Sequence, residues 1–373
     1  MVDVSRILQA ANFVAPNSGG IRTVLDRLAA GYGEAGHEVV QLVPGARPTV
    51  TETPWGRRIT VRGVPVPRTG YRLMSYRTAT EVIASVRPDR LEVHDRSTLR
   101  GLGRWARRRS IRSMIISHER LDRLARQWLP DTDRMRRLID RSNAWLGETF
   151  DEVLCTTDWA AEEFRAVGVP VMVVPLGVDL DRFRPGADAA LRNRLAPSGS
   201  LLVLASRLSR EKRPDLAVRA TAELLQRRAK VTLAVAGDGP QLRHLERLAW
   251  GMPVIFTGYL NGSDLPRLLA TADVAIAPGP VETFGLAALE ALASGTPVVA
   301  NAESALPSVL GPAGLAVAPT PTTFADAVEA LLARPAAARS SAARTRAESF
   351  DWARTVRRFL AAHDLSRLAE MRP

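Results

Sequence analysis

Short apolar runs rich in Val, Ile and Leu recur along the first half of the chain, separated by stretches with helical periodicity. Gly, Pro or Asp bounds most of these runs, as is typical of buried parallel strands. The alternation predicts a parallel sheet that is covered by helices on both faces. The predicted strands span residues 6–13, 38–43, 59–67, 91–94, 113–117 and 152–157, and the first predicted helix spans 21–30.

The alternation restarts in the second half, after an apolar run at 171–178 and a polar, proline-containing stretch at 179–200. We therefore predict an α/β fold with two domains, residues 1–182 and 183–350, followed by an amphipathic helix within 351–373. Two open α/β domains joined in this way form a cleft, and such folds bind ligands where their strands end. The strands predicted for the second domain span 201–205, 231–236, 254–257, 274–277 and 298–300.

The composition permits two buried cores, since the 373 residues are 46% hydrophobic and 24% charged. The single cysteine, Cys155, excludes an intramolecular disulfide and fits a reducing, cytoplasmic compartment. The N-terminal residues lack the basic and apolar pattern of a signal peptide. No run of about 18 uncharged apolar residues predicts a helix that spans a bilayer.

Positive charge is concentrated between residues 96 and 141, where 14 arginines face 5 acidic residues, within a chain of net charge +12. Nucleic acid, anionic lipid or no partner at all would each account for this segment. Arginine is abundant throughout, with Lys212 and Lys230 as the two lysines, so its abundance alone is a weak functional signal. Apolar residues at helical spacing within 120–141 predict a helix that lies on an anionic membrane or packs on the first domain.

The sharpest motif runs from Glu282 to Glu290, after the predicted strand at 274–277. A helix predicted over 284–294 would start at the end of that strand, facing the cleft. The backbone N–H groups of Phe284, Gly285 and Leu286 would then be free to bind an anion with the help of the helix dipole.

The two glutamates of this motif stand eight residues apart, so both would lie on nearly the same face. Glu282 precedes the anion site and would accept hydrogen bonds from sugar hydroxyls, while Glu290 is placed to hold a ribose diol. Alternatively, Glu282 is a favourable charge at a helix start and Glu290 is a surface residue.

Arg207 and Lys212 follow the first strand of the second domain and would point into the same cleft. Two cations there would stabilise a departing nucleoside diphosphate, although a solvent-exposed basic loop is the simpler alternative. Gly237 and Gly239 form a second strand–turn–helix junction, which is more typical of a tight turn than of a ligand contact. Gly19 and Gly20 precede the first helix, where the backbone could approach a phosphate or sugar, or form an ordinary loop.

His94 and His118 both end apolar runs of the first domain and would face the cleft, although a lone histidine is more often structural. Nothing in the sequence predicts a metal site, because no H-x-x-x-H or C-x-x-C occurs and neither D-x-D pair follows a suitable strand. We therefore expect a reaction without metal or other cofactor, in which the helix dipole, Arg207 and Lys212 take the place of a cation.

In this order and spacing, the motifs resemble the retaining glycosyltransferase family four, whose GT-B architecture has two Rossmann-like domains around a central cleft. The resemblance covers nearly the whole chain. Segments 116–122, 277–280 and 282–290 are similar to those of actinobacterial GDP-mannose-dependent α-mannosyltransferases acting on phosphatidylinositol mannosides or related glycolipids. The other marks of the family are residues 17–20, His118, 174–183, Arg207 with Lys212, and 237–240.

The resemblance implies a role for each matching residue. Gly19 and Gly20 would lie beside the donor phosphates and the acceptor, and His118 would contact the donor sugar near the reaction centre. The other implied donor contacts are Arg207 and Lys212 to the diphosphate, Glu282 and the 284–286 amides to the sugar, Glu290 to the ribose, and Tyr259 and Leu260 to the base. The sequence departs from the family at Arg213, where many relatives have glycine after the lysine.

The resemblance further implies mannosyl transfer with retention, by front-face attack within a tight ion pair. The partners it implies are a nucleotide-sugar, a lipid or glycolipid acceptor and the inner face of the plasma membrane, with the final helix crossing back to the first domain. A UDP-glucose or UDP-N-acetylglucosamine donor is the nearest rival. A nucleotide-sugar 2-epimerase and a nucleic-acid-binding protein are further alternatives, and no nucleic-acid motif accompanies the basic charge.

Overall fold

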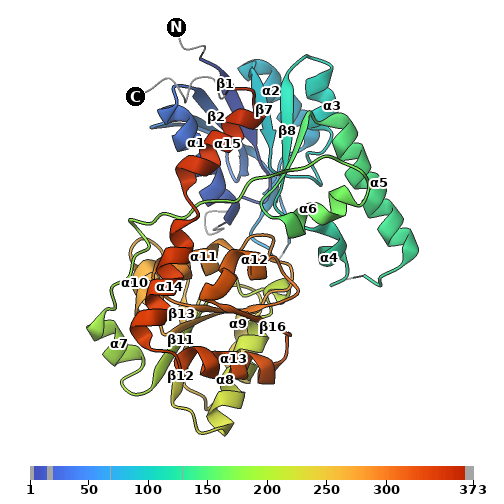
Figure 1. Ribbon diagram of the computed structural model, residues 1–373. Helices are drawn as coiled ribbons and strands as arrows, with labels where there is room; N and C mark the ends of the chain where they lie inside the picture. The colour runs from blue at the N-terminus through green and yellow to red at the C-terminus, as the bar shows by residue number, and fades with distance from the viewer. Residues whose placement is uncertain (1–3, 15–19, 68, 128, 366–373) are drawn as a thin grey trace. The chain divides into compact units, whose positions relative to one another are not determined.

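The computed structural model describes residues 4–14, 20–67, 69–127 and 129–365. The chain divides into two compact units, Met1–Leu176 with Trp352–Pro373, and Gly177–Asp351 (Figure 1). The division precedes the boundary expected at 182/183 because residues 177–183 pack on the second unit. There the Val178 N–H donates to the Phe350 carbonyl and Arg344 donates to the carbonyls of Leu180 and Phe183.

An eight-stranded sheet forms the centre of the first unit, in the order β10-β9-β8-β7-β1-β2-β4-β3. All neighbours are parallel except β3 and β4, and a small separate sheet pairs β5 with β6. The strands are β1 (Arg6–Ala10), β2 (Glu38–Gly45), β3 (Thr49–Thr53), β4 (Gly56–Arg62), β5 (Val64–Pro65), β6 (Arg72–Leu73), β7 (Arg90–Val93), β8 (Arg112–Ser117), β9 (Glu152–Cys155) and β10 (Met172–Val173).

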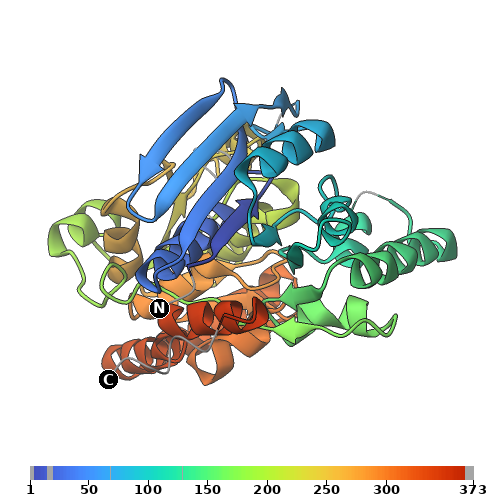
Figure 2. The ribbon, with the colours of Figure 1, turned by 90° about the horizontal axis from the view of Figure 1, so that it is seen from above.

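Helices cover both faces of this sheet. Side chains such as Leu8, Leu91 and Ile115 pack on one face against α2, α3, α5 and α6. The alternate residues point to the other face, where α15 runs beside α1 (Figures 1 and 2). The helices are α1 (Gly20–Glu34), α2 (Tyr76–Val86), α3 (Leu102–Arg107), α4 (Leu121–Ala125), α5 (Asp133–Thr149), α6 (Asp158–Arg165) and α15 (Trp352–Ala362).

The second unit has a six-stranded parallel sheet in the order β13-β12-β11-β14-β15-β16. The chain adds strands to one side of β11 and then returns to add β14 on its other side, so the order reverses between β11 and β14. The strands are β11 (Ser200–Ala205), β12 (Val231–Ala236), β13 (Val254–Gly258), β14 (Val274–Ala277), β15 (Val298–Asn301) and β16 (Leu315–Val317).

Helices α8 and α13 pack on one face of the second sheet, and α10, α11 and α14 pack together on the other. In the part of the chain that the structure describes, no helix is long and apolar enough to cross a membrane. The helices are α7 (Ala189–Leu195), α8 (Pro214–Gln226), α9 (Leu242–Leu248), α10 (Asp264–Thr271), α11 (Leu286–Ala293), α12 (Leu306–Leu310), α13 (Pro321–Leu332) and α14 (Ala336–Glu348).

Candidate active site

The loops after β11 and β14 lie side by side, because these two strands are parallel neighbours and each loop begins at the carboxyl end of its strand. In an open α/β sheet, the point where the strand order reverses is the usual place for a ligand. A small pocket lies there, and its lining includes Ser206, Lys212, Gly279, Glu282 and Gly285. Two of the predicted catalytic residues, Lys212 and Glu282, are therefore brought together although they stand far apart in the sequence.

Lys212 and Glu282 form an ion pair across this pocket, with 2.6 Å between Nζ and Oε1. Their side chains are 28% and 22% exposed, so the pair is accessible to a ligand from solvent. The Lys212 ammonium has three N–H donors. Its contact with Glu282 Oε1 uses one of them, so the others can bind a phosphate. The arrangement can bind an anion beside a carboxylate that accepts hydrogen bonds.

Arg207 lies on the same loop as Lys212, and its guanidinium donates to Glu211 Oε1 at 2.6 Å. Glu211, which no motif in the sequence indicated, also accepts from Ser209 Oγ at 2.5 Å. Burial raises the pKa of Glu211, but the hydrogen bonds from Ser209 and Arg207 outweigh burial and hold this pKa below its ordinary value. Glu211 thus fixes the Arg207 side chain next to the pocket.

The motif after β14 differs in detail from the prediction, because the helix expected over 284–294 begins at Leu286. Gly285 is the N-cap with φ of 84°, a left-handed conformation that favours glycine. Phe284 is a buried core residue whose ring packs edge-on against Phe350. The Glu282 carbonyl accepts from the Ala305 N–H, which ties this loop to the start of α12.

Glu290 lies in α11 and is half-buried. Burial raises its pKa to about 7; Arg182 lowers the pKa and Asp179 raises it further. In the ligand-free protein this carboxyl is therefore protonated in part near neutral pH. A carboxyl of this kind is typical of a functional site, where a ligand supplies the hydrogen bonds that stabilise the ionised form.

Gly237 and Gly239 bring the loop after β12 against the loop that carries Arg207. A Cβ on Gly237 would stand 1.9 Å from the Ser206 carbonyl oxygen, so only glycine fits there. The close approach accounts for this glycine without any ligand. Tyr259 and Leu260 directly follow β13, and Tyr259 is 45% exposed.

Two of the predicted residues of the first unit, His118 and Gly20, lie within the described part of the chain. His118 follows β8 and is half-buried, and Gly20 is the first residue of α1. Gly19 lies outside the described residues. The structure thus places Arg207, Lys212, Glu282 and the other predicted donor contacts from Gly237 to Glu290 in one unit, and His118 and Gly20 in the other.

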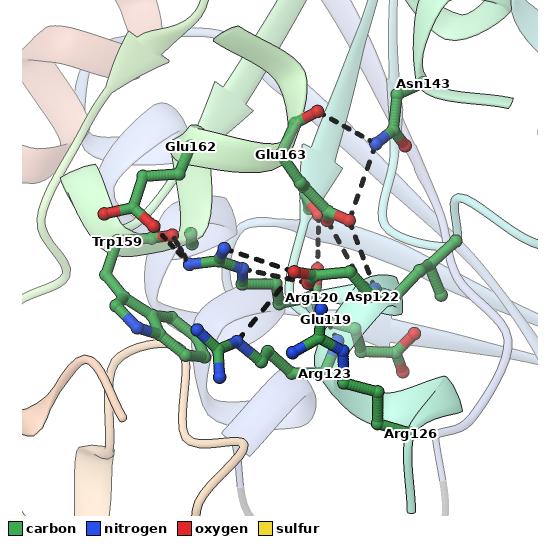
Figure 3. A network of polar contacts seen from close by, with 12 residues as sticks. Glu119, Arg120, Asp122, Arg123, Arg126, Asn143, Trp159, Glu162 and Glu163 are labelled. Atoms are coloured by element: carbon green, nitrogen blue, oxygen red, sulfur yellow. Dashed lines mark hydrogen bonds and ion pairs between the residues drawn. The ribbon is translucent and has the colours of Figure 1, made fainter. Parts of the chain in front are cut away.

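A network of charged residues fixes the loop that follows His118 (Figure 3). Arg120 donates to Asp122 Oδ1 at 2.9 Å and to Glu162 Oε2 at 2.6 Å, and its guanidinium lies 4.5 Å from the centre of the Trp159 ring. Glu163 accepts from the Leu121 N–H and pairs with the buried Arg96. These contacts hold the backbone directly after His118.

Models of known protein families match both units of the chain. A model described as "Glycosyl transferase 4-like domain" matches residues 19–177, and one described as "Glycosyl transferases group 1" matches residues 199–334. The chain is 45% identical over 366 residues to the GDP-mannose-dependent alpha-(1-6)-phosphatidylinositol dimannoside mannosyltransferase of Mycobacterium tuberculosis, with 95% of each chain covered. The chain belongs to the group 1 glycosyltransferases.

Solved structures show that this glycosyltransferase has the GT-B architecture. Sucrose-phosphate synthase from Thermosynechococcus elongatus superimposes with a TM-score of 0.80 at 22% identity, covering 96% of this chain and 98% of that one. HepE of Anabaena gives a TM-score of 0.77 at 17% identity, covering 97% and 100%. The predicted fold class and family are confirmed. Among the described residues, no group of three or more His, Cys, Asp and Glu side chains could hold a metal ion.

Proposed function

We propose that this glycosyltransferase transfers mannose from GDP-mannose to a phosphatidylinositol mannoside, with retention of configuration. The observation that carries the proposal is the 45% identity to the mycobacterial mannosyltransferase over 95% of both chains. Identity of this extent spans both units, and therefore the donor side and the acceptor side of the reaction.

The donor would bind to the second unit, at the point where the strand order reverses. Lys212 and Arg207 would neutralise the diphosphate, whose negative charge grows as the bond to mannose breaks. Both cations have an acidic partner within 2.6 Å in the ligand-free protein, so they are already oriented when the donor arrives. The amides at the start of α11 add donors that the helix itself does not use.

The two glutamates would then divide the recognition of the donor. Glu282 would accept hydrogen bonds from mannose hydroxyls beside Lys212, and Glu290 would accept from the ribose diol. Attack on the same face as the leaving group gives retention when the leaving phosphate takes the acceptor proton. His118 would contact the mannose from the first unit, and Gly20 would lie near the acceptor.

The outer face of α5 supports contact with an anionic membrane, where a glycolipid acceptor resides. Arg134, Arg137 and Arg141 are exposed there around Leu138, which is 52% exposed. The inner face of α5 carries the buried residues Ile139, Asn143, Leu146 and Thr149. Exposed arginines around an apolar side chain favour peripheral binding to anionic lipid.

Calorimetric titration with GDP and UDP, without metal, tests the choice of donor. We expect tight binding of GDP and weak binding of UDP. A preference for UDP would retain the fold and site but overturn mannose as the transferred sugar. Binding of neither nucleotide would contradict the assignment of the pocket between β11 and β14 as the donor site.

A further inference from the structure

A carboxylate lies buried in the middle of the first sheet, on the face covered by α1 and α15. Glu92 of β7 is 0% exposed. Its Oε1 accepts from the Tyr32 hydroxyl and from His363 Nε2 at 2.8 Å, and its Oε2 accepts from Gln9 Nε2 at 2.8 Å and pairs with His94 Nε2 at 3.3 Å. A buried carboxylate is costly unless hydrogen bonds satisfy it, and here four donors converge on it.

The chain of contacts continues from Glu92 to the histidine that the proposed function places beside the donor sugar. His94 Nδ1 lies 2.9 Å from His118 Nε2, and the two rings stack at 14° with their centres 5.2 Å apart. His94 is buried. The two histidines are adjacent because His94 follows β7 and His118 follows the neighbouring strand β8. Glu92, His94 and His118 thus form one continuous line from the core to the end of the sheet.

We propose that Glu92 and His94 are positioning residues that set the tautomer and the ring orientation of His118. A neutral imidazole has one N–H donor and one acceptor nitrogen. The carboxylate requires the proton of His94 on Nε2, which makes His94 Nδ1 an acceptor. His118 then donates from Nε2 to His94, which makes its Nδ1 the acceptor nitrogen of the ring.

The electrostatics of the cluster agree with these protonation states. Burial raises the pKa of Glu92, but the hydrogen bonds from His363 and His94 outweigh burial and keep this pKa well below its ordinary value. Burial and the neighbouring His94 lower the pKa of His118 to about 3, against an opposing effect of Glu92. At neutral pH the line therefore has an ionised carboxylate at one end and an uncharged imidazole at the other.

The role assigned here rests on the proposed contact between His118 and the donor sugar, but the tautomer can be tested without activity. The experiment is ¹⁵N NMR of the histidine rings at pH 7 in the full chain, with His118→Gln to assign the signal. We expect His118 to be protonated on Nε2. Protonation of His118 on Nδ1 would overturn the proposal. His118 Nε2 would then be an acceptor, and His94 would have to be an imidazolium that donates both to Glu92 and to His118.

Glu92→Gln tests the cause. An amide in place of the carboxylate presents an NH₂ group either to His94 or to His363. Where the NH₂ group faces His94, His94 Nε2 must accept and Nδ1 must donate, so the Nδ1–H tautomer of His118 should appear. The matched control is His363→Gln, which removes an equally buried partner from the far oxygen and should leave the tautomer unchanged. If Glu92→Gln does not fold, His94→Gln replaces it, and an unchanged His118 signal in the folded variant would contradict the proposal.

Steady-state kinetics then show whether Glu92 acts by positioning His118 or only by stabilising the fold. Glu92→Gln should lower kcat by about 10- to 100-fold, as expected when the outer partner of a functional histidine is removed. In the His118→Ala background the same change should have no further effect on kcat. A further loss there would mean that Glu92 acts on stability and not through His118. If His118→Ala alone leaves turnover intact, the proposed role of His118 fails while the NMR result stands.

Discussion

The two units are built on parallel sheets of the same kind, but their charged residues lie in different places. The first unit encloses Glu92 and the pair of Arg96 with Glu163 inside the fold, where partners from several elements satisfy them. The second unit has a largely apolar sheet, and the pair of Lys212 with Glu282 lies half-exposed in loops at its end. Buried pairs fix a structure, whereas half-exposed pairs are available to a ligand, so the comparison separates positioning charges from binding charges.

The largest effect is expected from breaking the buried pair of the first unit. Arg96→Ala leaves the Glu163 carboxylate uncompensated and should destabilise the protein by about 3–5 kcal/mol. Thermal and urea unfolding, followed with a probe in each unit, measures the effect. The control is Arg104→Ala, which removes an exposed arginine of the same unit. Equal stability of the two variants would contradict a structural role for the buried pair.

Removing the half-exposed cation should affect turnover and not folding. We expect Lys212→Ala to lower kcat by on the order of 100-fold or more, because the leaving diphosphate loses a charge-assisted donor. Steady-state kinetics beside an unfolding curve separates the two effects. Lys230→Ala is a matched control, since Lys230 is an exposed lysine of the same unit. Near-normal turnover of the Lys212 variant would refute the assignment of the site.

Glu290 extends the comparison, because it is a carboxyl group of the second unit whose ionised form is destabilised by burial. Hydrogen bonds from a ligand would stabilise that ionised form. The pKa of about 7 lies above the ordinary value of 4.5. The cost is therefore absent below about pH 4.5, grows as the pH rises and is complete above 7. Glu290→Gln should stabilise the protein at pH 8 by no more than about 3 kcal/mol, and not at pH 4.5. Denaturant titrations at both pH values measure this difference.

The same residue should make GDP binding depend on pH. In the proposed complex the ribose diol would donate to the ionised form, so affinity should fall about tenfold between pH 8 and pH 6 as Glu290 takes up a proton. Calorimetry with the Glu290→Gln variant corrects for titration of the nucleotide. A wild-type pH dependence equal to that of the variant would exclude Glu290 as the ribose contact.

The smallest effect per residue is expected on the outer face of α5. The double change Arg134→Ala and Arg141→Ala should weaken binding to anionic vesicles at low salt by about 1 kcal/mol per residue. Vesicle sedimentation measures this binding. Arg357→Ala with Arg358→Ala changes the charge equally on the exposed side of α15 and serves as the control. Equal losses would mean that total charge, and not the α5 face, governs membrane binding.

Much of the fold was predictable because its strands are apolar runs bounded by turn residues. Strands β3 and β16 were not predicted, since Thr49–Thr53 is polar and exposed and Leu315–Val317 is short. Helix α7, within the polar stretch at 179–200, was not predicted either. These elements depend on pairing with distant strands or on packing in the second unit, which local periodicity does not record.

The candidate site was predictable to the level of loops but not of contacts. Lys212 and Glu282 were both expected at strand ends, but their ion pair depends on the strand order that makes β11 and β14 neighbours. Glu92 was visible as an acidic residue within an apolar run, yet its distant partners come from α1, from β1 and from the residue after α15. No local pattern indicates such a convergence.

The central claim is that this chain transfers mannose from GDP-mannose to a phosphatidylinositol mannoside. The most direct test incubates the purified protein with GDP-mannose and phosphatidylinositol dimannoside in anionic vesicles, followed by mass spectrometry and NMR of the lipid. We predict addition of one hexose in α-linkage, without comparable product from UDP-glucose. Product from UDP-glucose alone, or none from either donor while GDP-mannose stays bound, would contradict the account.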